Sequence, residues 1–284
     1  MKILFYGNCQ INTICKTLNL NSNKYETHVI MCHESNSNLE QEVYFTNLLK
    51  IMDIIITQPI SDNYLGKEYL STSYMVRNCK PDCKVIILPS YHFNLYYFDC
   101  NYYRKLPGPS DYHYANMIEC YKQGKSADYY LEHYVNNPDL KSKEELEKIA
   151  DECITELDNR YNDSQKYKII NANVITIPIS KFIQENYKQT LLFHAINHPT
   201  KALFHHVCHE ILNILQIENT IDYWSDFLSA TIRSIMYKCV EQVISFKQSV
   251  PLIDFPNYAY HHDVKGVTEF YYNGYRKLDQ SCFD

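Results

Sequence analysis

Short apolar runs alternate with helical patterns in the first hundred residues. The runs that predict buried strands are residues 3–6, 25–31, 53–57 and 84–88, each ended by Gly, Pro or a polar cluster. The helical patterns between them cover residues 10–19, 39–51 and about 62–77. This alternation predicts an α/β fold in which helices cover a parallel sheet.

The pattern becomes largely helical from about residue 110 to the C-terminal part. Ser142 and Glu145 have the spacing of a capping box. The apolar stripe that follows consists of Leu146, Ile149, Cys153, Ile154 and Leu157. A longer stripe after Asp222, from Trp224 to Phe246, predicts a helix that faces the core.

The remaining elements decide the expected domain organisation. Residues 190–193 predict a strand, and residues 199–215 predict a helix. No linker rich in Gly or Ser divides the chain. We therefore expect one domain over residues 1–284, in which the helices at about 105–165 form an inserted cap.

Composition and charge exclude several classes of protein. Of the 284 residues, 45% are hydrophobic and 21% are charged, as in ordinary globular proteins. The net charge of -6 gives no overall positive field for nucleic acid or an anionic membrane. The apolar runs are far shorter than the roughly 18 residues of a membrane-spanning helix, and the N-terminal run is too short for a secretory signal. Eleven Cys without short paired spacings suit free thiols in a reducing compartment, so we expect a cytoplasmic protein.

The turn after the first predicted strand carries the sharpest chemical signal. Gly7-Asn8-Cys9-Gln10 follows that strand directly, at the edge of a parallel sheet where open α/β proteins bind ligands. Cys9 then stands at a helix N-terminus, whose unpaired N–H groups favour the reactive thiolate. The N–H groups of Cys9 or Gln10, with the Asn8 side chain, could also stabilise an oxyanion. The alternative is a structural Cys9 with Asn8 as a helix cap.

A histidine far along the chain offers a general base. His198 follows the strand predicted at residues 190–193 and precedes Pro199, which suits the first position of a helix. A helix N-terminus disfavours the imidazolium, so we expect a neutral His198 that can accept a proton. Because Cys9 and His198 each follow a predicted strand, we expect both at one sheet edge. A capping or core histidine is the alternative.

Two motifs give the chain a resemblance to a known family. They are Gly7-Asn8-Cys9-Gln10 after the opening strand and Phe193 to Thr200 (FHAINHPT) late in the chain. Together they resemble the WcbI-type polysaccharide biosynthesis acetyltransferases, cytoplasmic enzymes of surface-glycan pathways that bind coenzyme A. The layout is also similar to that of the SGNH hydrolases, in which the nucleophile follows the first strand. The resemblance covers residues 1 to about 100 and 188–215, and it implies an SGNH/flavodoxin-like three-layer core.

The resemblance implies a role for each of two residues. Cys9 would be the thiol that accepts or positions an acyl group, and His198 would be the base. SGNH enzymes place an Asp three residues before the His, where this chain has Ala195, so an acid that orients His198 comes from elsewhere or is absent. The implied reaction is acetyl transfer from acetyl-CoA to a hydroxyl or amino group of a sugar or nucleotide-linked sugar.

Other residues are candidates for the same pocket. Gln58 and Ser61 follow the third predicted strand and offer amide and hydroxyl donors. After the fourth strand, Asn94 could donate to an oxyanion, and aromatic rings could stack on a sugar or on adenine. The candidates for binding the substrate or coenzyme A are Tyr91, His92, Asn197, Thr200 and, for the phosphates, Arg77, Arg104, Lys105 and Lys201. Packing or turn formation is the alternative for each.

Three further observations bear on cofactors and on competing functions. His205 and His209 have a metal-like spacing but lie on the polar half of an amphipathic helix, and we expect no metal. Neither a P-loop nor a dinucleotide-binding glycine motif occurs in the sequence. Two other functions stay open: an SGNH-like thiol esterase that deacylates glycans, and a non-catalytic carbohydrate-binding protein. A homodimer is compatible with the sequence.

Overall fold

A parallel sheet lies at the centre of the first of two compact units. The computed structural model describes residues 1–34, 39–103, 106, 111–218, 220–229, 234–247, 263–278 and 280–283. The first unit comprises residues 1–91, 155–183 and 201–225, and the second comprises residues 92–154, 184–200 and 226–284. The expected single domain with a helical cap at about 105–165 stays a prediction.

The sheet contains five parallel strands in the order β2-β1-β3-β4-β7. Their bounds are β1 Lys2–Gly7, β2 Glu26–Met31, β3 Ile54–Thr57, β4 Lys84–Ile87 and β7 Val174–Thr176. β1, β3 and β4 are buried on both faces, which explains why their sequences read as continuous apolar runs. The predicted α/β fold with a parallel sheet is confirmed, and the strand order is that of flavodoxin-like folds.

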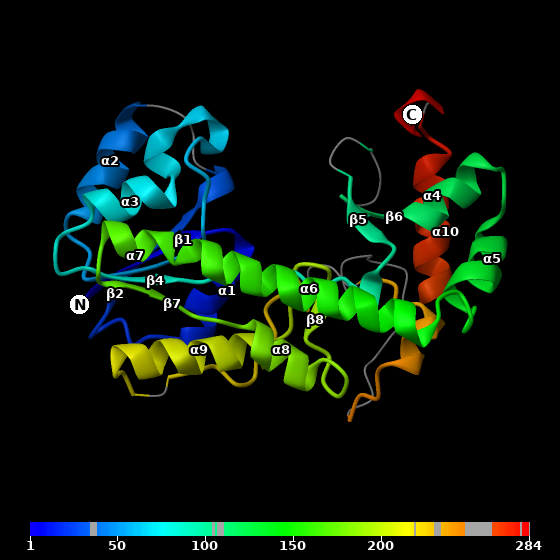
Figure 1. Ribbon diagram of the computed structural model, residues 1–284. Coiled ribbons are helices and arrows are strands. Elements are labelled where there is room, and N and C mark those ends of the chain that lie inside the picture. The colour runs from blue at the N-terminus through cyan, green and yellow to red at the C-terminus, as the bar shows by residue number, and fades with distance from the viewer. Residues whose placement is uncertain are drawn as a thin grey trace. The chain divides into compact units, whose positions relative to one another are not determined.

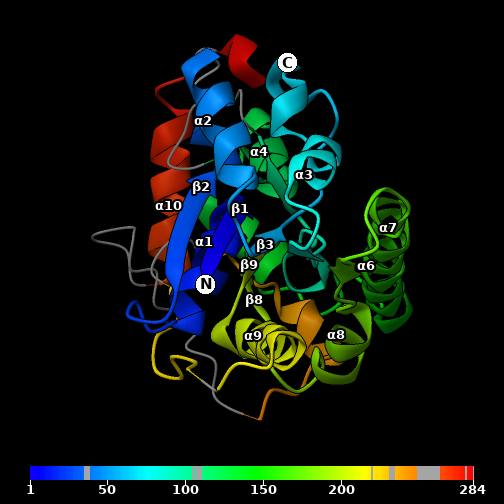
Figure 2. The same ribbon diagram turned by 90° about the vertical axis from the view of Figure 1, so that its left-hand side faces the viewer.

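Helices cover both faces of this sheet (Figures 1 and 2). On one face, α2 (Leu39–Leu49), α3 (Thr72–Asn78) and α7 (Lys166–Ile170) share one apolar core with the strands. On the other face, α1 (Cys9–Leu18) packs against α9 (Lys201–Leu215). In open α/β folds of this kind, ligands bind at the turns that follow the carboxyl ends of the strands.

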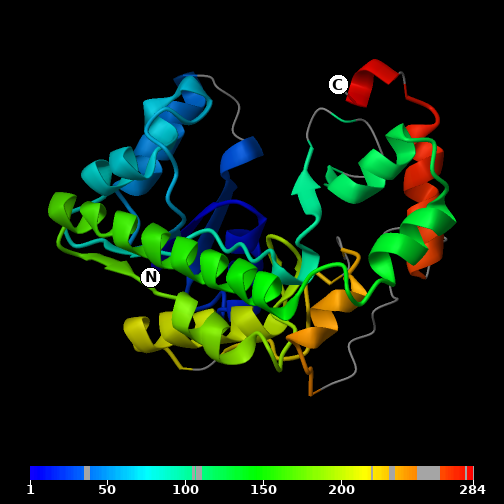
Figure 3. The same ribbon diagram turned by 45° about the vertical axis from the view of Figure 1, so that its right-hand side comes forward.

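The second unit combines helices with two small antiparallel sheets. α4 (Ala115–Lys122), α5 (Ala127–Tyr130) and α10 (Val264–Tyr275) lie side by side (Figures 1 and 3). The sheets pair β5 (Cys100–Tyr102) with β6 (Tyr112–Tyr114), and β8 (Phe193–Ala195) with β9 (His198–Pro199).

The remaining described elements of both units are α6 Lys143–Ser164, α8 Ser180–Asn186, a π-helix Leu131–Val135 and 3-10 helices Cys32–Glu34, Tyr64–Gly66, Glu68–Leu70, Leu95–Tyr97, Lys238–Gln242 and Gln280–Phe283.

A buried carboxylate connects elements of the second unit. Asp99 accepts hydrogen bonds from the Tyr237 hydroxyl at 2.5 Å and from the Asn116 N–H at 3.1 and 3.2 Å. The Tyr237 hydroxyl lies 2.8 Å from the Tyr130 hydroxyl of α5. Burial raises the pKa of Asp99 to about 6, although the Tyr237 hydroxyl and the Asn116 N–H act to lower it. Asp99 therefore supplies the acceptor that two buried donors require.

The capping box and the apolar stripe predicted for α6 are confirmed. The Glu145 N–H donates to Ser142 Oγ at 3.2 Å, and the Ser142 N–H donates to the Glu145 carboxylate at 2.7 Å. Leu146, Ile154 and Leu157 of the stripe are buried. The local signals for this helix and its tertiary environment agree, which explains why the sequence pattern predicts it well.

The helix predicted over residues 62–77 is broken. Two 3-10 turns precede α3, and Leu65 within the first of them adopts a positive φ of 52° that no α-helix contains. α3 starts again from Ser71, whose Oγ accepts a hydrogen bond from the Tyr74 N–H at 3.0 Å. A cap inside the predicted helix therefore sets a later start.

The long helix predicted after Asp222 is wrong in the described part of that segment. Asp222 Oδ1 accepts hydrogen bonds from the N–H groups of Trp224 and Ser225, as a cap would, but the chain continues as turns. Trp224, expected to face the core, is 91% exposed. The stripe is rich in aromatic and β-branched residues, whose helix propensity is modest, so packing of the chain in a turn conformation prevails.

Several strands also differ from the prediction, and the sequence pattern predicts none of β5, β6 and β9. The pattern does not predict β7, which is only three residues long. The strand predicted at residues 190–193 begins at Phe193, and it pairs with β9 outside the parallel sheet. His198 therefore lies in β9 and not at a helix N-terminus, and the expectation that Cys9 and His198 share one sheet edge is wrong.

Replacing Asp99 tests its anchoring role. In Asp99→Ala the Tyr237 hydroxyl and the Asn116 N–H lose their acceptor, so we expect the free energy of unfolding to fall by about 3–5 kcal/mol. Asp99→Asn keeps one acceptor oxygen and should cost less, about 1–2 kcal/mol. Urea denaturation followed by circular dichroism measures both. The control is Asp128→Ala, an exposed residue paired with Lys265, and an equal loss in this variant would contradict the assignment.

Candidate active site

The turn after β1 presents Cys9 as the first residue of α1. β1 ends at Gly7, and Asn8 caps the helix, because its Oδ1 accepts a hydrogen bond from the Gln10 N–H at 2.9 Å. Cys9 is half-buried, and its carbonyl accepts a hydrogen bond from Thr13 Oγ1 at 2.9 Å. The thiol therefore lies in the first turn of a helix, at the carboxyl edge of the parallel sheet.

Two glutamine side chains connect this turn to the turns after β3 and β4. Gln58 Oε1 accepts a hydrogen bond from the Asn8 N–H at 3.1 Å, and Gln58 Nε2 donates to Gln10 Oε1 at 2.8 Å. Gln10 Oε1 also accepts from the Tyr91 N–H at 3.0 Å, and Gln10 Nε2 donates to the Tyr91 carbonyl at 2.9 Å. We call Asn8, Gln10, Gln58 and Tyr91 the glutamine network. It holds the ends of three adjacent strands in one arrangement next to Cys9.

The glutamine network changes the roles expected for its members. The side chains of Gln10 and Gln58 are 1% and 2% exposed, and their amides bond to each other and to the backbone. The Tyr91 ring is 1% exposed, so it offers no open face for stacking, and burial raises the pKa of its hydroxyl. These residues position the turn that carries Cys9.

Gly7 is required for the close approach of two neighbours. A Cβ atom at this position would lie 2.6 Å from Ile11 Cγ1 and 2.9 Å from Gln58 Oε1. Both distances are shorter than contacts between these atoms allow. Gly7 therefore acts through its lack of a side chain, which lets α1 and Gln58 meet the end of β1.

Burial governs the protonation of Cys9. It raises the pKa of the thiol, and hydrogen bonds from the backbone N–H groups of Gln10 and Cys9 lower the pKa only in part. The expectation of a thiolate stabilised by the helix N-terminus is therefore wrong, because desolvation outweighs the N–H groups. At neutral pH Cys9 is a thiol, and it needs a base to become a nucleophile.

His198 lies in the second unit, in a hairpin held by Tyr112. The Tyr112 hydroxyl donates to Asn197 Oδ1 at 2.6 Å, and the Tyr112 ring centroid lies 5.7 Å from that of His198. His198 is 7% exposed, and its Nδ1 has no hydrogen-bond partner among the described residues. Burial and then the neighbouring His194 lower the pKa of His198 to about 4. His198 is neutral, as expected, but burial and not a helix dipole is the cause.

A histidine–carboxylate pair was not predicted from the sequence. His194 Nε2 and Asp226 Oδ2 lie 2.9 Å apart in the second unit, and the His194 side chain is 7% exposed. A carboxylate on one ring nitrogen fixes the orientation of an imidazole and supports its positive charge. Asp226 thus contacts His194, and the Nδ1 of His198 has no carboxylate partner among the described residues. The wrong helix prediction after Asp222 hid Asp226 from the sequence analysis.

The other predicted residues of the second unit have mixed surroundings. Thr200 is buried, and its Oγ1 donates to the Leu191 carbonyl at 2.8 Å, which is a structural bond. The Asn94 N–H contacts Cys153 Sγ at 3.3 Å, and the buried Asn94 Oδ1 has no partner within the described ranges. His92 is half-buried.

The cations expected to bind phosphates are not gathered in one place. Arg77 forms a 2.6 Å ion pair with Glu68, and Lys201 is exposed at the start of α9. Arg104 and Lys105 lie outside the described residues. Ser61, expected as a hydroxyl donor, lines a cavity of the first unit together with Arg160.

The polar half predicted for α9 is confirmed. Its buried residues are Leu203, Phe204, Val207, Cys208, Ile211 and Leu212. His205 Nε2 lies 3.1 Å from the Asp222 carbonyl oxygen, and His209 Nε2 lies 2.9 Å from the Tyr223 hydroxyl. Among the described residues, no group of three or more His, Cys, Asp or Glu is placed to hold a metal ion.

Comparisons with known proteins identify the family. The family model for the polysaccharide biosynthesis enzyme WcbI matches residues 2–220. The chain belongs to the WcbI family. Its fold is similar to a solved structure of WcbI, described as native protein without a disulfide bond between coenzyme A and a cysteine. The TM-score is 0.80 at 19% identity, over 99% of this chain and 92% of that chain. No curated protein matches the chain.

The part of the chain matched by the WcbI model contains both motifs that suggested the family, so the predicted family is confirmed. The family is described as one of polysaccharide biosynthesis enzymes. Within the residues that the structure describes, no helix is long and apolar enough to cross a membrane.

Adding a methyl group at Gly7 tests the close approach at the Cys9 turn. Gly7→Ala places a Cβ against Ile11 Cγ1 and Gln58 Oε1, so we expect it to lower the free energy of unfolding by about 1–3 kcal/mol. Ile11→Ala removes the closest of these atoms. The cost of Gly7→Ala, measured by urea denaturation, should therefore be smaller in the Ile11→Ala background. An identical cost in both backgrounds would contradict the steric explanation.

The protonation of His198 gives the native state a measurable pH dependence. Its pKa is lowered from 6.5 to about 4 by folding, so its contribution is complete above about pH 6.5 and is lost as pH falls towards 4. Through this group, the free energy of unfolding should fall by about 3 kcal/mol as the pH falls through this range. Urea denaturation across this range should show a shallower pH slope in His198→Asn. The control is His33→Asn, whose side chain is 53% exposed, and an unchanged slope in His198→Asn would refute a buried neutral imidazole.

Proposed function

We propose that this WcbI-family protein is an acetyltransferase that moves an acetyl group from acetyl-CoA to a hydroxyl or amino group of a sugar. The acceptor is a nucleotide-linked or glycan-bound sugar of a surface polysaccharide. The observation that carries the proposal is a half-buried thiol, Cys9, held by the glutamine network at the ligand-binding edge of a parallel sheet. The structure of WcbI whose fold is similar is described in relation to coenzyme A and a cysteine.

The proposed chemistry has two routes that the same residues support. In the covalent route, Cys9 Sγ attacks the acetyl carbonyl, His198 takes the thiol proton, and the bond between carbon and the coenzyme sulfur breaks. The coenzyme leaves as a thiol after it receives that proton. The sugar nucleophile then attacks the acetyl-Cys9 carbonyl, the bond between carbon and Cys9 Sγ breaks, and His198 passes the sugar proton to Cys9 Sγ. In the direct route, His198 takes the proton from the sugar nucleophile as it attacks acetyl-CoA, the bond between carbon and the coenzyme sulfur breaks, the coenzyme receives that proton and leaves as a thiol, and Cys9 positions the acyl group.

The pKa values limit how the proton moves. The Cys9 thiol has a raised pKa and His198 has a pKa of about 4, so a free thiolate beside an imidazolium is unfavourable. We therefore infer that the proton leaves Cys9 as the new carbon–sulfur bond forms.

Two groups are candidates to hold the oxyanion of the tetrahedral intermediate. The Gln10 N–H already donates to Asn8 Oδ1, and the Asn8 N–H donates to Gln58. We assign the oxyanion to the Asn8 Nδ2 group and to the Cys9 N–H, which would turn from its own thiol to the oxyanion. Gln10 and Gln58 keep these donors in place.

We place the reaction in the cytoplasm and use no metal in the proposed mechanism. All eleven cysteines are free thiols, which suits a reducing compartment. Assembly as a homodimer stays a prediction.

Release of coenzyme A from acetyl-CoA tests the proposal. With a panel of nucleotide-linked amino and deoxy sugars, we expect thiol release that depends on the sugar, because a site that excludes water suppresses hydrolysis. His198→Ala should lower the rate by about 10² to 10⁴. Cys9→Ala should abolish the covalent route and reduce the direct route less.

Cys15→Ala provides the matched control, because Cys15 is a half-buried thiol of the same helix and should leave the rate unchanged. Release of acyl groups from glycans without coenzyme A would instead identify a thiol esterase. Sugar binding without turnover, equal in wild type and in both variants, would identify a carbohydrate-binding protein.

A further inference from the structure

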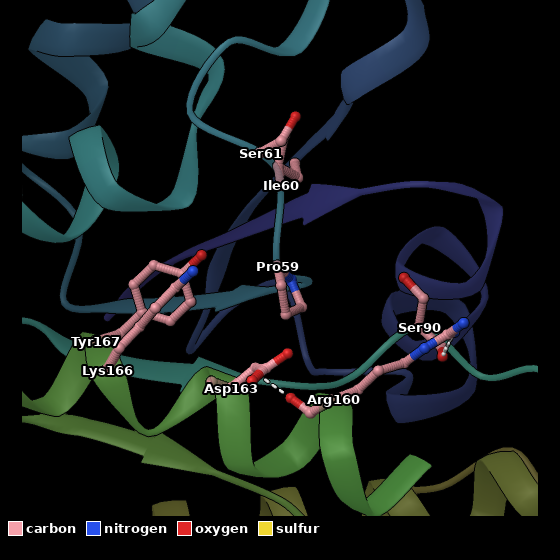
Figure 4. A pocket seen from close by; sticks show the side chains of 9 residues that line it. Pro59, Ile60, Ser61, Ser90, Arg160, Asp163, Lys166 and Tyr167 are labelled. Atoms are coloured by element: carbon pink, nitrogen blue, oxygen red, sulfur yellow. Dashed lines mark hydrogen bonds between the residues drawn. The ribbon is translucent and has the colours of Figure 1, made fainter. Parts of the chain in front are cut away.

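A cavity of about 340 Å³ lies in the first unit, beside the turns after β3 and β4. Pro59, Ile60 and Ser61 line it from the turn after β3, and Ser90 lines it from the turn after β4. The last turn of α6 and the start of α7 form the opposite wall (Figure 4). The volume is within the usual range for small-molecule sites.

Two cations line the cavity, and each keeps a donor available. Arg160 bonds to Glu156 through Nε at 2.8 Å and to the Ser90 carbonyl through Nη1 at 2.9 Å, and its Nη2 has no acceptor among the described residues. The Lys166 ammonium lies 5.2 Å from the centroid of the Tyr167 ring and pairs with no carboxylate of the described chain. Both side chains thus keep N–H donors for an anionic ligand, on a wall that also carries the Asp163 carboxylate.

The polar groups on the walls have the chemistry of a nucleotide site. Ser61 and Ser90 also line the cavity, and hydroxyl, ammonium and guanidinium donors are the usual partners of phosphate oxygens. Asp163, the one carboxylate on the wall, would repel a bare phosphate but can accept hydrogen bonds from ribose hydroxyls. The set therefore matches a phosphorylated nucleoside better than inorganic phosphate.

The backbone connects the cavity directly to the Cys9 turn. Pro59 follows Gln58, and Ser90 precedes Tyr91, so two wall segments are extensions of the glutamine network. The cavity and Cys9 thus lie at the same edge of one sheet and within one unit. A substrate with phosphates at one end and a reacting group at the other can use both.

We propose that this cavity binds the nucleoside diphosphate part of a substrate, with Lys166 and Arg160 on the phosphates and Asp163 on the ribose. The inference rests on the proposed function, which supplies two ligands that contain this group, coenzyme A and a nucleotide-linked sugar.

Calorimetric titration of wild type, Lys166→Ala and Lys168→Ala tests the proposal. Lys168 is exposed on the same short helix and does not line the cavity, so it provides the matched control. The probes are coenzyme A and a uridine-diphosphate-linked amino sugar. We expect Lys166→Ala to bind one of these probes about tenfold or more weakly, with a shallower salt dependence, and Lys168→Ala to bind like wild type. The probe that is weakened identifies the ligand of the cavity.

Failure of the cavity assignment and failure of the transferase are distinguishable. Equal affinities of all three proteins for both probes, or no binding of either probe by wild type, would overturn the cavity assignment. If acceptor-dependent release of coenzyme A persists in that case, the transferase stands. If the sugar nucleotide binds through Lys166 while wild type neither binds coenzyme A nor releases it from acetyl-CoA, the cavity assignment stands and the transferase fails.

Discussion

The hydrogen bond from the buried amide of Gln58 to that of Gln10 fixes the geometry on which the candidate site depends. The Gln58 amide also accepts a hydrogen bond from the turn after β1, and the Gln10 amide accepts one from the turn after β4. The ends of β1, β3 and β4 therefore cannot move independently. Each of these groups would cost about 1–3 kcal/mol if it were left buried and unpaired. The absence of a side chain at Gly7 makes the arrangement possible, because a Cβ there would meet Gln58.

Desolvation sets the protonation states of both candidate catalytic groups. It raises the pKa of Cys9 and lowers that of His198, so both groups are neutral at physiological pH. A neutral thiol and a neutral imidazole suit acyl transfer only if the proton moves during attack on the carbonyl. This restricts reaction with water or oxidants in the absence of substrate, since the thiolate is the reactive form of cysteine.

The sequence predicts β1, β3 and β4 of the parallel sheet well because these strands are buried on both faces and stand out as apolar runs. It does not predict β7, which has only three residues. It also predicts a helix around Trp224, because a cap signal at Asp222 precedes apolar residues at helical spacing, whereas the described chain there forms turns. The sequence does identify Gly7-Asn8-Cys9-Gln10 as a candidate site, because this motif directly follows the first predicted strand. The partnership of His194 with Asp226, and that of Gln10 with Gln58, joins residues far apart in the chain, which no local pattern indicates.

Protection of individual thiols by coenzyme A is the most direct test of Cys9 as the reacting group. The protein is alkylated above pH 9, where a thiol of raised pKa becomes reactive, and modification at each cysteine is quantified by peptide mass spectrometry. Coenzyme A should slow modification of Cys9 and leave that of Cys15, on the same helix, unchanged. Equal modification of Cys9 with and without coenzyme A, under conditions in which coenzyme A binds, would contradict a site at this turn.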